Sequence, residues 1–303
     1  MTNQIFIADE TDADTRIDTF LSGVLEDISR TKIQEYIKSH LVCINENFCK
    51  PSTIIHIEDK IVCNFDNISD KVIEPENINI DIVYEDENIA IVNKPSGMLT
   101  HPTSKERNNT LVNALIYKYG ENLSDINGLY RRGIVHRLDR NTSGLLIIAK
   151  NNSAHEKISE MIRNRQIEKH YRAVVKGIIS EDMIIDTPIG RNKTQPNKMC
   201  TTPDGKPSLT EIKVLKQYKD ATFIDINLKT GRTHQIRVHL SSINHPVYND
   251  TLYGFGKMKI KTEEQVLQSF KLKFTNPFNH NIIDIEIPPD DKITKVLNYL
   301  DNK

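Results

Sequence analysis

The chain has 303 residues, of which 38% are hydrophobic and 27% are charged, and its formal net charge is -1. This composition is typical of a globular protein of one or two domains with a sizeable buried core. No apolar run approaches the roughly 18 residues that a membrane-spanning helix needs. The acidic first residues also lack the features of a signal peptide. We therefore expect a cytoplasmic protein.

The charged residues are unevenly distributed along the chain. Residues 70–87 are acidic, whereas basic side chains gather between residues 131 and 176. The near-zero net charge argues weakly against nucleic-acid binding, but a locally basic face is compatible with it, as is an ordinary solvated surface. The four cysteines form no CxxC pair and no zinc-like spacing with histidine, so we expect reduced thiols and no metal.

The first part of the chain is predicted to hold two helices and two short strands. Apolar residues recur with a helical period within 15–38, and Ser29 can cap a second helix there. The stretches 41–45 and 59–65 have the pattern of short strands. Together these elements predict a small, compact α/β unit.

The predicted elements divide the chain into a small domain (12–70), a polar acidic linker (71–79) and a large domain (80–303). The large domain is predicted to contain two strands within 80–97, a helix capped by Thr110, a buried strand at 145–150, a helix at 152–164, strands at 171–178, 210–216, 221–229, 270–275 and 282–287, and helices from about 233 and 291. Strands dominate without regular βαβ alternation. This pattern predicts an α+β fold with a mainly antiparallel sheet.

Polar side chains are densest in the segment RRGIVHRLDRNTSGLLIIAK (131–150). Asp139 lies between Arg137 and Arg140, two cations that favour its ionised form. The polar loop leads directly into an apolar strand, which is a rigid support for an active-site residue. On composition alone, however, a structural Asp–Arg pair is the more common explanation.

A second polar cluster is LKTGRTHQIRVHLSSINHPVYND (228–250). A helix is expected to begin near Thr233, with His234 and Arg237 in its first turns and Arg232 beside it. Helix N-termini and guanidinium groups attract phosphate or carboxylate. The three histidines of this segment lack the spacing of a metal site, and the chain has no phosphate-binding glycine loop, GxSxG elbow or zinc-deaminase motif.

The run HRLDRNTSGLLIIAK (136–150) resembles the catalytic motif of RNA pseudouridine synthases of the RluA type. Further segments match in the family's order: VNKPSGMLTHP (92–102), EKHYRAVVKG (168–177), TGRTHQIRVHL (230–240) and HPVYNDTLYG (245–254). In the last segment Asn249 replaces a family glycine. The resemblance covers about 80–303. It implies an isomerase (EC 5.4.99.-) that converts uridine to pseudouridine in RNA without a cofactor.

The first domain resembles an S4 RNA-binding domain. The matching segments are TRIDTFLSG (15–23), SRTKIQEYIKSHLVCIN (29–45) and EDK (58–60). Two departures concern turns: the family often has Gly where His40 stands and Asn-Gly where Asn45-Glu46 stands. These departures put the local turn geometry in question more than the identity of the domain.

The resemblance also implies roles for individual residues. Asp139 matches the essential carboxylate, Arg237 the arginine that pairs with it, and Tyr171 the tyrosine that packs on the target base and is a candidate for proton removal. Arg137 matches a residue that enters the stack where the base has left. Further candidates for RNA contact or base flipping are His136, Arg140, Thr142, Arg232, His234, Lys94, Arg30 and Lys32.

The reaction breaks the N1–C1′ bond of a flipped uridine and joins C5 to C1′. A bidentate Arg237 would orient Asp139 and keep it ionised. Asp139 can then act as nucleophile, as base or as electrostatic stabiliser, and the sequence does not choose among these. Family analogy favours the 23S ribosomal RNA of the large subunit as substrate. Separately, we expect a monomeric enzyme. The alternatives are a tRNA enzyme of the same family and a non-catalytic S4-type RNA-binding or chaperone protein.

Overall fold

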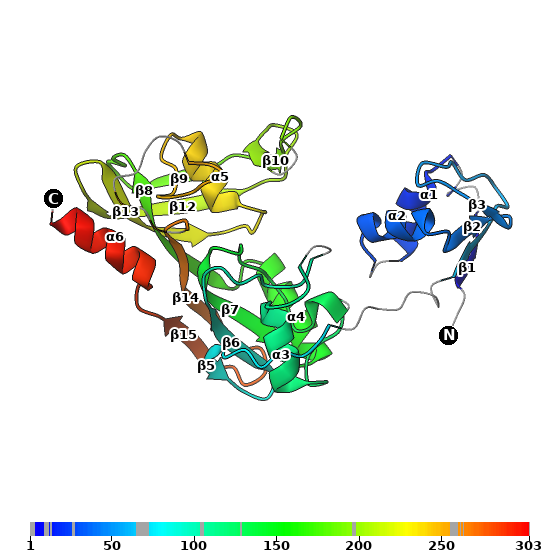
Figure 1. Cartoon of the computed structure of the whole chain (residues 1–303), viewed down its shortest axis with the longest axis horizontal. Coiled ribbons are helices and arrows are strands. Elements are labelled where there is room, and N and C mark those ends of the chain that lie inside the picture. Colours follow the sequence, from blue (N-terminus) through cyan, green and yellow to red (C-terminus); the bar gives the residue numbers. More distant parts are fainter. Residues whose placement is uncertain are drawn as a thin grey trace. The chain divides into compact units, whose positions relative to one another are not determined.

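The computed structural model describes residues 4–8, 12, 14–25, 28–64, 73–103, 106–127, 129–195, 198–254, 260, 262 and 264–302. The chain forms two compact units (Figure 1). The first comprises Met1–Ile73 and Ile126–Leu129, and the second comprises Glu74–Asp125 and Tyr130–Lys303. Within the described part of the chain, no helix combines the length and the apolar character that a membrane span requires.

The N-terminal unit consists of a four-stranded antiparallel sheet and two helices that share one core. Its strand order is β1 (Gln4–Ile7), β4 (Lys60–Cys63), β2 (Val42–Ile44) and β3 (Asn47–Phe48). Helix α1 (Ile17–Val24) packs against α2 (Arg30–Lys38). As predicted, Ser29 caps α2 by accepting the backbone N–H of Lys32 at 3.3 Å.

This unit has a strand that was not predicted, and its structure also settles the geometry of the turns in question. Strand β1 precedes the predicted boundary at residue 12, and it was missed because it is short and its Ile5 and Ile7 face solvent. The turn positions where the S4 family often has glycine are left-handed here, with φ of 59° at His40 and 66° at Glu46, and so is the intervening Asn45, with φ of 49°. The chain therefore keeps the turn geometry without the glycine that would adopt it most easily.

The predicted linker at 71–79 is only partly a connection, and its residues 71 and 72 lie outside the described part of the chain. The carbonyl of Glu74 accepts the side-chain amide of Asn113 at 2.8 Å. The Glu76 N–H donates to the Asn113 carbonyl at 3.1 Å, and the Glu76 carboxylate accepts the Asn109 N–H at 3.0 Å. Glu74 is thus the first residue of the C-terminal unit.

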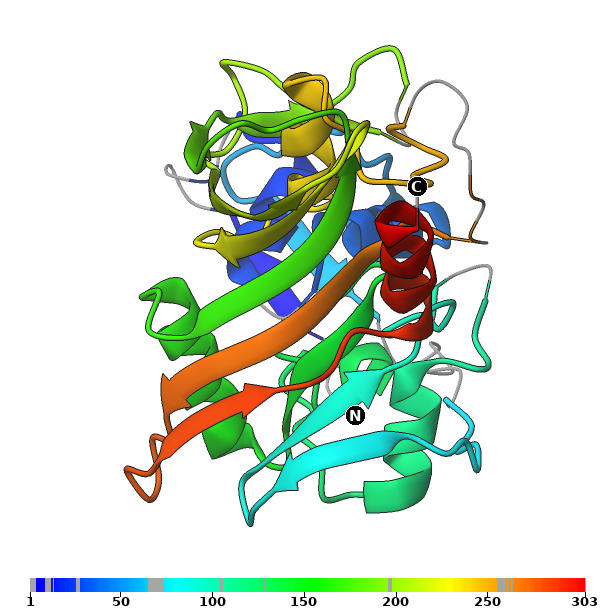
Figure 2. The ribbon, with the colours of Figure 1, turned by 90° about the vertical axis from the view of Figure 1, so that its left-hand side faces the viewer.

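The C-terminal unit is built on a nine-stranded sheet. The strand order is β5 (Asp81–Glu85), β6 (Ile89–Lys94), β7 (Ser143–Ala149), β14 (Leu267–Thr275), β8 (Glu168–Lys176), β13 (Ala221–Leu228), β12 (Leu209–Gln217) and β9 (Met183–Asp186), with β15 (Ile282–Glu286) paired to β14. Among these strands only β7 and β14 pair in parallel. Figure 2 shows the sheet from one face. The predicted α+β class with a mainly antiparallel sheet is confirmed.

Strand β7 supports the loop that carries Asp139, and all seven of its residues are buried. Helix α4 (Asn152–Arg163) covers one face of this strand with Ala154 and Ile158. Helix α3 (Leu111–Tyr119) begins at Thr110, which caps it as predicted. The predicted strand at 145–150 is apolar along its whole length because it lies inside the sheet and a helix covers it.

The parallel contact between β7 and β14 is short and close. It pairs Ser143–Gly144 with Gln268–Ser269, and farther along β14 the strand β15 takes the place of β7. At Gly144 φ is +113°, and a Cβ atom there would lie 2.0 Å from the carbonyl oxygen of Ser269. Only glycine fits this crossing, which anchors the end of the Asp139 loop.

The remaining elements flank the sheet. A two-stranded ribbon is formed by β10 (Ile189–Arg191) and β11 (Met199–Thr201), which, like β9, was not predicted. Helix α5 (Gln235–Ser242) begins two residues later than expected, because its N-cap His234 is left-handed with φ 56° and ψ 19°. The last helix is α6 (Asp291–Asp301), with Asp290 as its N-cap.

Candidate active site

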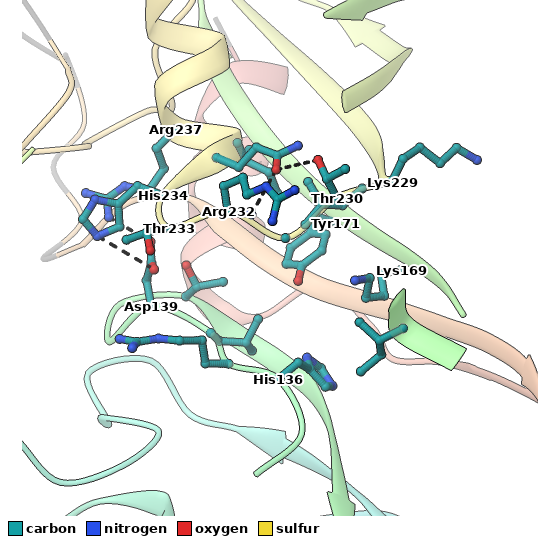
Figure 3. Close-up of a pocket in the computed structure, with 18 of the residues that line it drawn as sticks. His136, Asp139, Lys169, Tyr171, Lys229, Thr230, Arg232, Thr233, His234 and Arg237 are labelled. Atoms are coloured by element: carbon teal, nitrogen blue, oxygen red, sulfur yellow. Dashed lines mark hydrogen bonds and ion pairs between the residues drawn. The ribbon is translucent and has the colours of Figure 1, made fainter. Parts of the chain in front are cut away.

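A pocket of about 430 Å³ lies in the C-terminal unit (Figure 3). Its walls come from the loop before β7, from β8 and from the turn that leads into α5. Of the residues predicted from the sequence, it brings together His136, Arg137, Asp139, Thr142, Tyr171, Arg232, His234 and Arg237. Segments about 100 residues apart in the chain thus meet at one site, in agreement with the predicted motifs.

Arg237 is shared by two carboxylates. Its Nη1 donates to Oδ2 of Asp139 at 2.9 Å, so the predicted pairing of these two residues is present. The expectation that Arg237 binds Asp139 through two hydrogen bonds is wrong, however. The Nε and Nη2 atoms of Arg237 donate instead to Asp250, at 2.7 and 3.0 Å.

Asp250 is the residue of this site that sequence reasoning missed, although it lies in the quoted segment HPVYND. Its side chain is fully buried and accepts the N–H groups of Leu252 and Tyr253, each at 2.9 Å. Burial opposes the charge of both partners, but their mutual hydrogen bonds outweigh it, so the pKa of Asp250 is lowered and that of Arg237 is raised. A permanently charged, rigid guanidinium therefore orients Asp139.

Asn249, which replaces a family glycine, keeps the turn before Asp250 in shape. Its φ is 58°, a left-handed value that Asn tolerates better than most residues. Its side-chain amide donates to Thr262 Oγ1 at 2.8 Å and to the Ile260 carbonyl at 3.2 Å. The substitution is thus accommodated without displacing Asp250.

His234 is held with one ring nitrogen toward Asp139. Its Nε2 lies 3.9 Å from Asp139 Oδ1, and its Nδ1 lies 2.8 Å from the hydroxyl of Tyr253. The Tyr253 oxygen already accepts the Met199 N–H at 2.8 Å, so its own hydrogen is available for Nδ1. Burial lowers the pKa of His234 and favours the neutral ring. The proton of that ring is therefore assigned to Nε2, which faces Asp139.

Tyr171 projects from β8 into the pocket and is only 5% exposed. Burial raises its pKa, so the side chain is a phenol at neutral pH. A flat aromatic face with one hydroxyl suits packing on a base. The raised pKa disfavours the phenolate that a direct proton acceptor would need.

Three other predicted residues line the pocket and differ in their exposure and hydrogen-bond partners. Arg137 is exposed at its edge, with Nη1 3.5 Å from Nε2 of His101. Arg232 donates to the Pro207 carbonyl at 3.2 Å. His136 accepts the Ile147 N–H through Nε2, and burial lowers its pKa to about 3, so it is neutral.

Thr142 and Arg140 come from the same loop but face different surroundings. Thr142 is buried in the pocket wall, where its hydroxyl accepts the side-chain amide of Gln265 at 3.3 Å. Arg140 does not line the pocket and forms an ion pair with Glu106. The structure therefore separates Arg140 from the residues that surround Asp139.

The expectation that Lys94 contacts RNA is wrong. Its side chain is fully buried, and its ammonium donates to the carbonyls of Pro95, Met98 and Arg140 at 2.8, 2.8 and 3.0 Å. A buried ammonium with these three partners cannot reach a ligand. Lys94 instead ties the turn after β6 to the loop that carries Asp139.

Arg30 and Lys32 lie in the N-terminal unit and not in the pocket. Arg30 is half exposed and donates to the buried carboxylate of Asp18, at 3.0 Å for the closest pair of atoms. Lys32 pairs with Glu35 at 3.3 Å and lies over the ring of Tyr36. Both keep part of their charge accessible on α2.

The described residues contain no group of three or more His, Cys, Asp and Glu side chains arranged to hold a metal ion. The pocket instead offers the oriented carboxylate of Asp139, the fixed guanidinium of Arg237, the phenol of Tyr171 and the neutral imidazoles of His136 and His234. This set suits chemistry at a sugar carbon next to a flat base.

Comparisons with known proteins agree with this chemistry. The family model of RNA pseudouridylate synthase matches residues 88–242. The chain is 39% identical over 303 residues to a Bacillus subtilis protein named uncharacterized RNA pseudouridine synthase YlyB, covering 99% of each chain. It is 36% identical over 266 residues to ribosomal large subunit pseudouridine synthase D of Escherichia coli, covering 88% of this chain and 80% of the relative. The solved structure of human RNA pseudouridylate synthase domain containing 1 is 25% identical, with a TM-score of 0.58 over 75% of this chain and 97% of that one.

Proposed function

Because the chain belongs to the RNA pseudouridylate synthase family, and is therefore an isomerase that acts on RNA, we propose that it modifies 23S ribosomal RNA of the large subunit and that Asp139 is its reacting carboxylate. The observation that carries the site assignment is the position of Asp139, held by Arg237 at 2.9 Å inside a pocket lined by Tyr171. The name of the Escherichia coli relative supports the choice of RNA.

The proposed roles follow the geometry of the pocket. A uridine leaves its helix, its base packs on Tyr171, and Arg137 at the exposed edge occupies the space that the base has left. Asp139 acts at the ribose while Arg237 fixes its orientation. The neutral His234 directs its Nε2–H toward the same carboxylate. This scheme uses no cofactor.

The N-terminal unit is proposed to be an S4-type RNA-binding domain. Its support is the sequence resemblance together with a small helix-and-sheet unit that presents Arg30 and Lys32 on α2. Basic side chains of this kind bind the phosphate backbone without reading sequence. We propose that the unit adds affinity for RNA, and that the enzyme acts as a monomer in the cytoplasm.

The catalytic assignment is tested by replacing Asp139 with Asn and with Ala and measuring tritium release from 5-tritiated RNA. We expect turnover to fall at least about 10³-fold, as it does when a reacting carboxylate is removed from other enzymes. The affinity for RNA should stay within about twofold. Asp204→Asn is the matched control, because Asp204 is an exposed carboxylate outside the pocket. Near-wild-type turnover of the Asp139 variants would refute the assignment.

The RNA substrate is tested by mapping pseudouridines in a strain that lacks the protein. We expect one or more sites to be lost from 23S ribosomal RNA and to return when the wild-type chain is supplied, but not when Asp139→Asn is supplied. Loss from transfer RNA alone would assign the other substrate. An unchanged pseudouridine map, together with an inactive purified protein, would support the non-catalytic alternative.

A further inference from the structure

The lysine side chains of Lys94, Lys169 and Lys292 in the C-terminal unit are largely removed from solvent, and Lys169 differs from the other two. Lys94 donates to three backbone carbonyls. Lys292, 14% exposed, donates to Ser96 and to the carbonyls of Asn141 and Gln265. Lys169 is 7% exposed. Among the residues that the structure describes, no hydrogen bond or ion pair involves its ammonium.

Lys169 lines the catalytic pocket. It lies two residues before Tyr171 on β8, so both side chains project from the same face of the strand, about 7 Å apart along it. Figure 3 shows the two side chains beside each other in the pocket. This spacing is comparable to the width of one pyrimidine base. A base that packs on Tyr171 therefore has one edge within reach of the Lys169 ammonium.

Burial is the cause that lowers the pKa of Lys169, and the pocket that it lines has apolar as well as charged walls. Val135, Ile162 and Leu228 contribute to the pocket lining, and the nearby His136 is uncharged because burial and the charge of Lys169 lower its pKa to about 3. The Nε2 atom of His136 already accepts the backbone N–H of Ile147. No protein carboxylate among the described residues compensates the lysine.

An ammonium without a protein partner is unfavourable in a largely buried position, and proteins usually satisfy such groups, as this one does at Lys94. Burial accordingly lowers the pKa of Lys169. A residue kept at this cost is best explained by a ligand that brings the missing negative charge.

The flipped base fits this requirement better than the RNA backbone. Arg163 and Arg165 line the same pocket but are exposed, so they are the groups placed to meet phosphates at the surface. Lys169 lies as deep as Tyr171, at 7% against 5% exposure, where the base is expected. Apolar walls also suit a flat base more than a hydrated phosphate.

We propose that the Lys169 ammonium binds a carbonyl oxygen of the flipped uracil and stabilises the negative charge that the base acquires when it leaves the ribose. The inference rests on the proposed function. When the N1–C1′ bond breaks, its electron pair stays on uracil and is shared between N1 and the two carbonyl oxygens. When C5 has bonded to C1′, the C5 proton leaves and N1 gains one, so the product is an isomer of the substrate. Lys169 keeps its proton throughout and acts only through its charge.

The test compares Lys169→Met, Lys169→Arg and the control Lys213→Met, an exposed lysine on β12 outside the pocket. In single-turnover assays at saturating RNA, Lys169→Met should form pseudouridine about 10²-fold more slowly than wild type, the usual effect of losing one group that stabilises developing charge. Lys169→Arg should recover part of this loss. RNA affinity should stay within about twofold, and the Tm of Lys169→Met should be unchanged or higher, because an unpaired buried charge is removed.

Several outcomes would overturn the proposal. A saturating rate within twofold of wild type would show that Lys169 does not act in the reaction. Weaker binding with an unchanged saturating rate, and a salt dependence reduced by about one charge, would identify a phosphate contact instead. A lower Tm without rescue by Lys169→Arg would identify a structural role. Failure of the proposed function itself would be recognised separately, because the wild-type protein would then form no pseudouridine.

Discussion

At the scale of single residues, the site depends on one guanidinium that serves two carboxylates. Arg237 gives two hydrogen bonds to the buried Asp250 and one to the partly exposed Asp139. Asp250 therefore determines where the arginine lies, and the arginine determines where the reacting carboxylate lies. Asp250 acts as a positioning residue, since it does not line the pocket.

Replacing Asp250 with Asn should affect both stability and rate. The substitution leaves the buried Arg237 without its fixed anion, so we expect the free energy of unfolding to fall by about 3 kcal/mol. The saturating single-turnover rate should fall more than the RNA affinity, because Asp139 loses its orientation. Urea unfolding and single-turnover assays measure the two effects, with Asp204→Asn as control. A stable variant with a normal rate would contradict this role of Asp250.

Tyr253 is expected to control which nitrogen of His234 carries the proton. In Tyr253→Phe the hydroxyl that faces Nδ1 is lost, so the ring is no longer held with its proton on Nε2. Nitrogen-15 NMR of labelled histidine should show a mixture of tautomers, and the saturating rate should fall about tenfold. Phe keeps the ring that lies under the Arg237 guanidinium and the backbone N–H that Asp250 accepts, so the Arg237–Asp139 pair should stay in place. An unchanged tautomer would disprove the assignment.

The sequence predicted the site residues that belong to a recognisable motif. It did not predict the contacts that depend only on how distant segments pack. The motifs predicted that Asp139, Tyr171 and Arg237 meet, and they do in the pocket. Nothing in the local sequence tells which of two aspartates receives the fork of Arg237. The burial of Lys94 was equally hidden, because the carbonyls that bind it belong to turns whose shape the sequence does not show.

At the scale of secondary-structure elements, the crossing of β7 and β14 limits what the chain can tolerate. We expect Gly144→Ala to lower the free energy of unfolding by about 3 kcal/mol or more, because its methyl group would overlap the Ser269 carbonyl. Gly120→Ala is the matched control: its φ is also positive, at +57°, but the space beside it is open. That variant should lose less, about 1–2 kcal/mol, because it adds backbone strain at φ 57° and ψ −122° without a steric overlap. Equal losses in thermal unfolding would show that close approach is not the cause.

Long elements with a clear period were predictable; of the very short strands, β2 and β4 were expected and most of the others were not. The apolar runs of β7, β8 and β13 and the cap residues of α2 and α3 led to the correct assignments. Strands β1, β9, β10 and β11 have only three or four residues each, too few for alternation to be recognised. Such short strands form only because they pair with a distant segment. For example, β1 pairs with β4, which follows it by more than 50 residues.

At the scale of the whole molecule, each unit has a hydrophobic core of its own. All residues that line the catalytic pocket belong to the C-terminal unit. The order of strands in the large sheet, with β14 between β7 and β8, could not be read from the sequence, since it depends on pairings between distant segments. The class of the fold, by contrast, followed from the excess of strands.

Deleting residues 1–70 should separate RNA affinity from catalysis. We expect the shortened protein to keep the pocket and its saturating rate within about tenfold, and to bind RNA more weakly with a smaller salt dependence, because basic contacts are removed. Selectivity among RNAs should also fall. Filter binding at several salt concentrations and single-turnover assays would measure this. Unchanged affinity for the natural RNA would contradict an RNA-binding role of the N-terminal unit.

The contacts of Lys292 and Asp290 also fix the time at which the enzyme can first become active. Lys292 donates to the carbonyl of Asn141 in the catalytic loop, and Asp290 accepts the hydroxyl of Ser143 at the start of β7. Lys292 follows Asn141 by 151 residues, so a ribosome makes it on the order of 10 s later. During that interval the nascent chain carries Asp139 on a loop that is not yet closed. We therefore expect the loop that carries Asp139 to reach its final form only after residues 290–292 have been made.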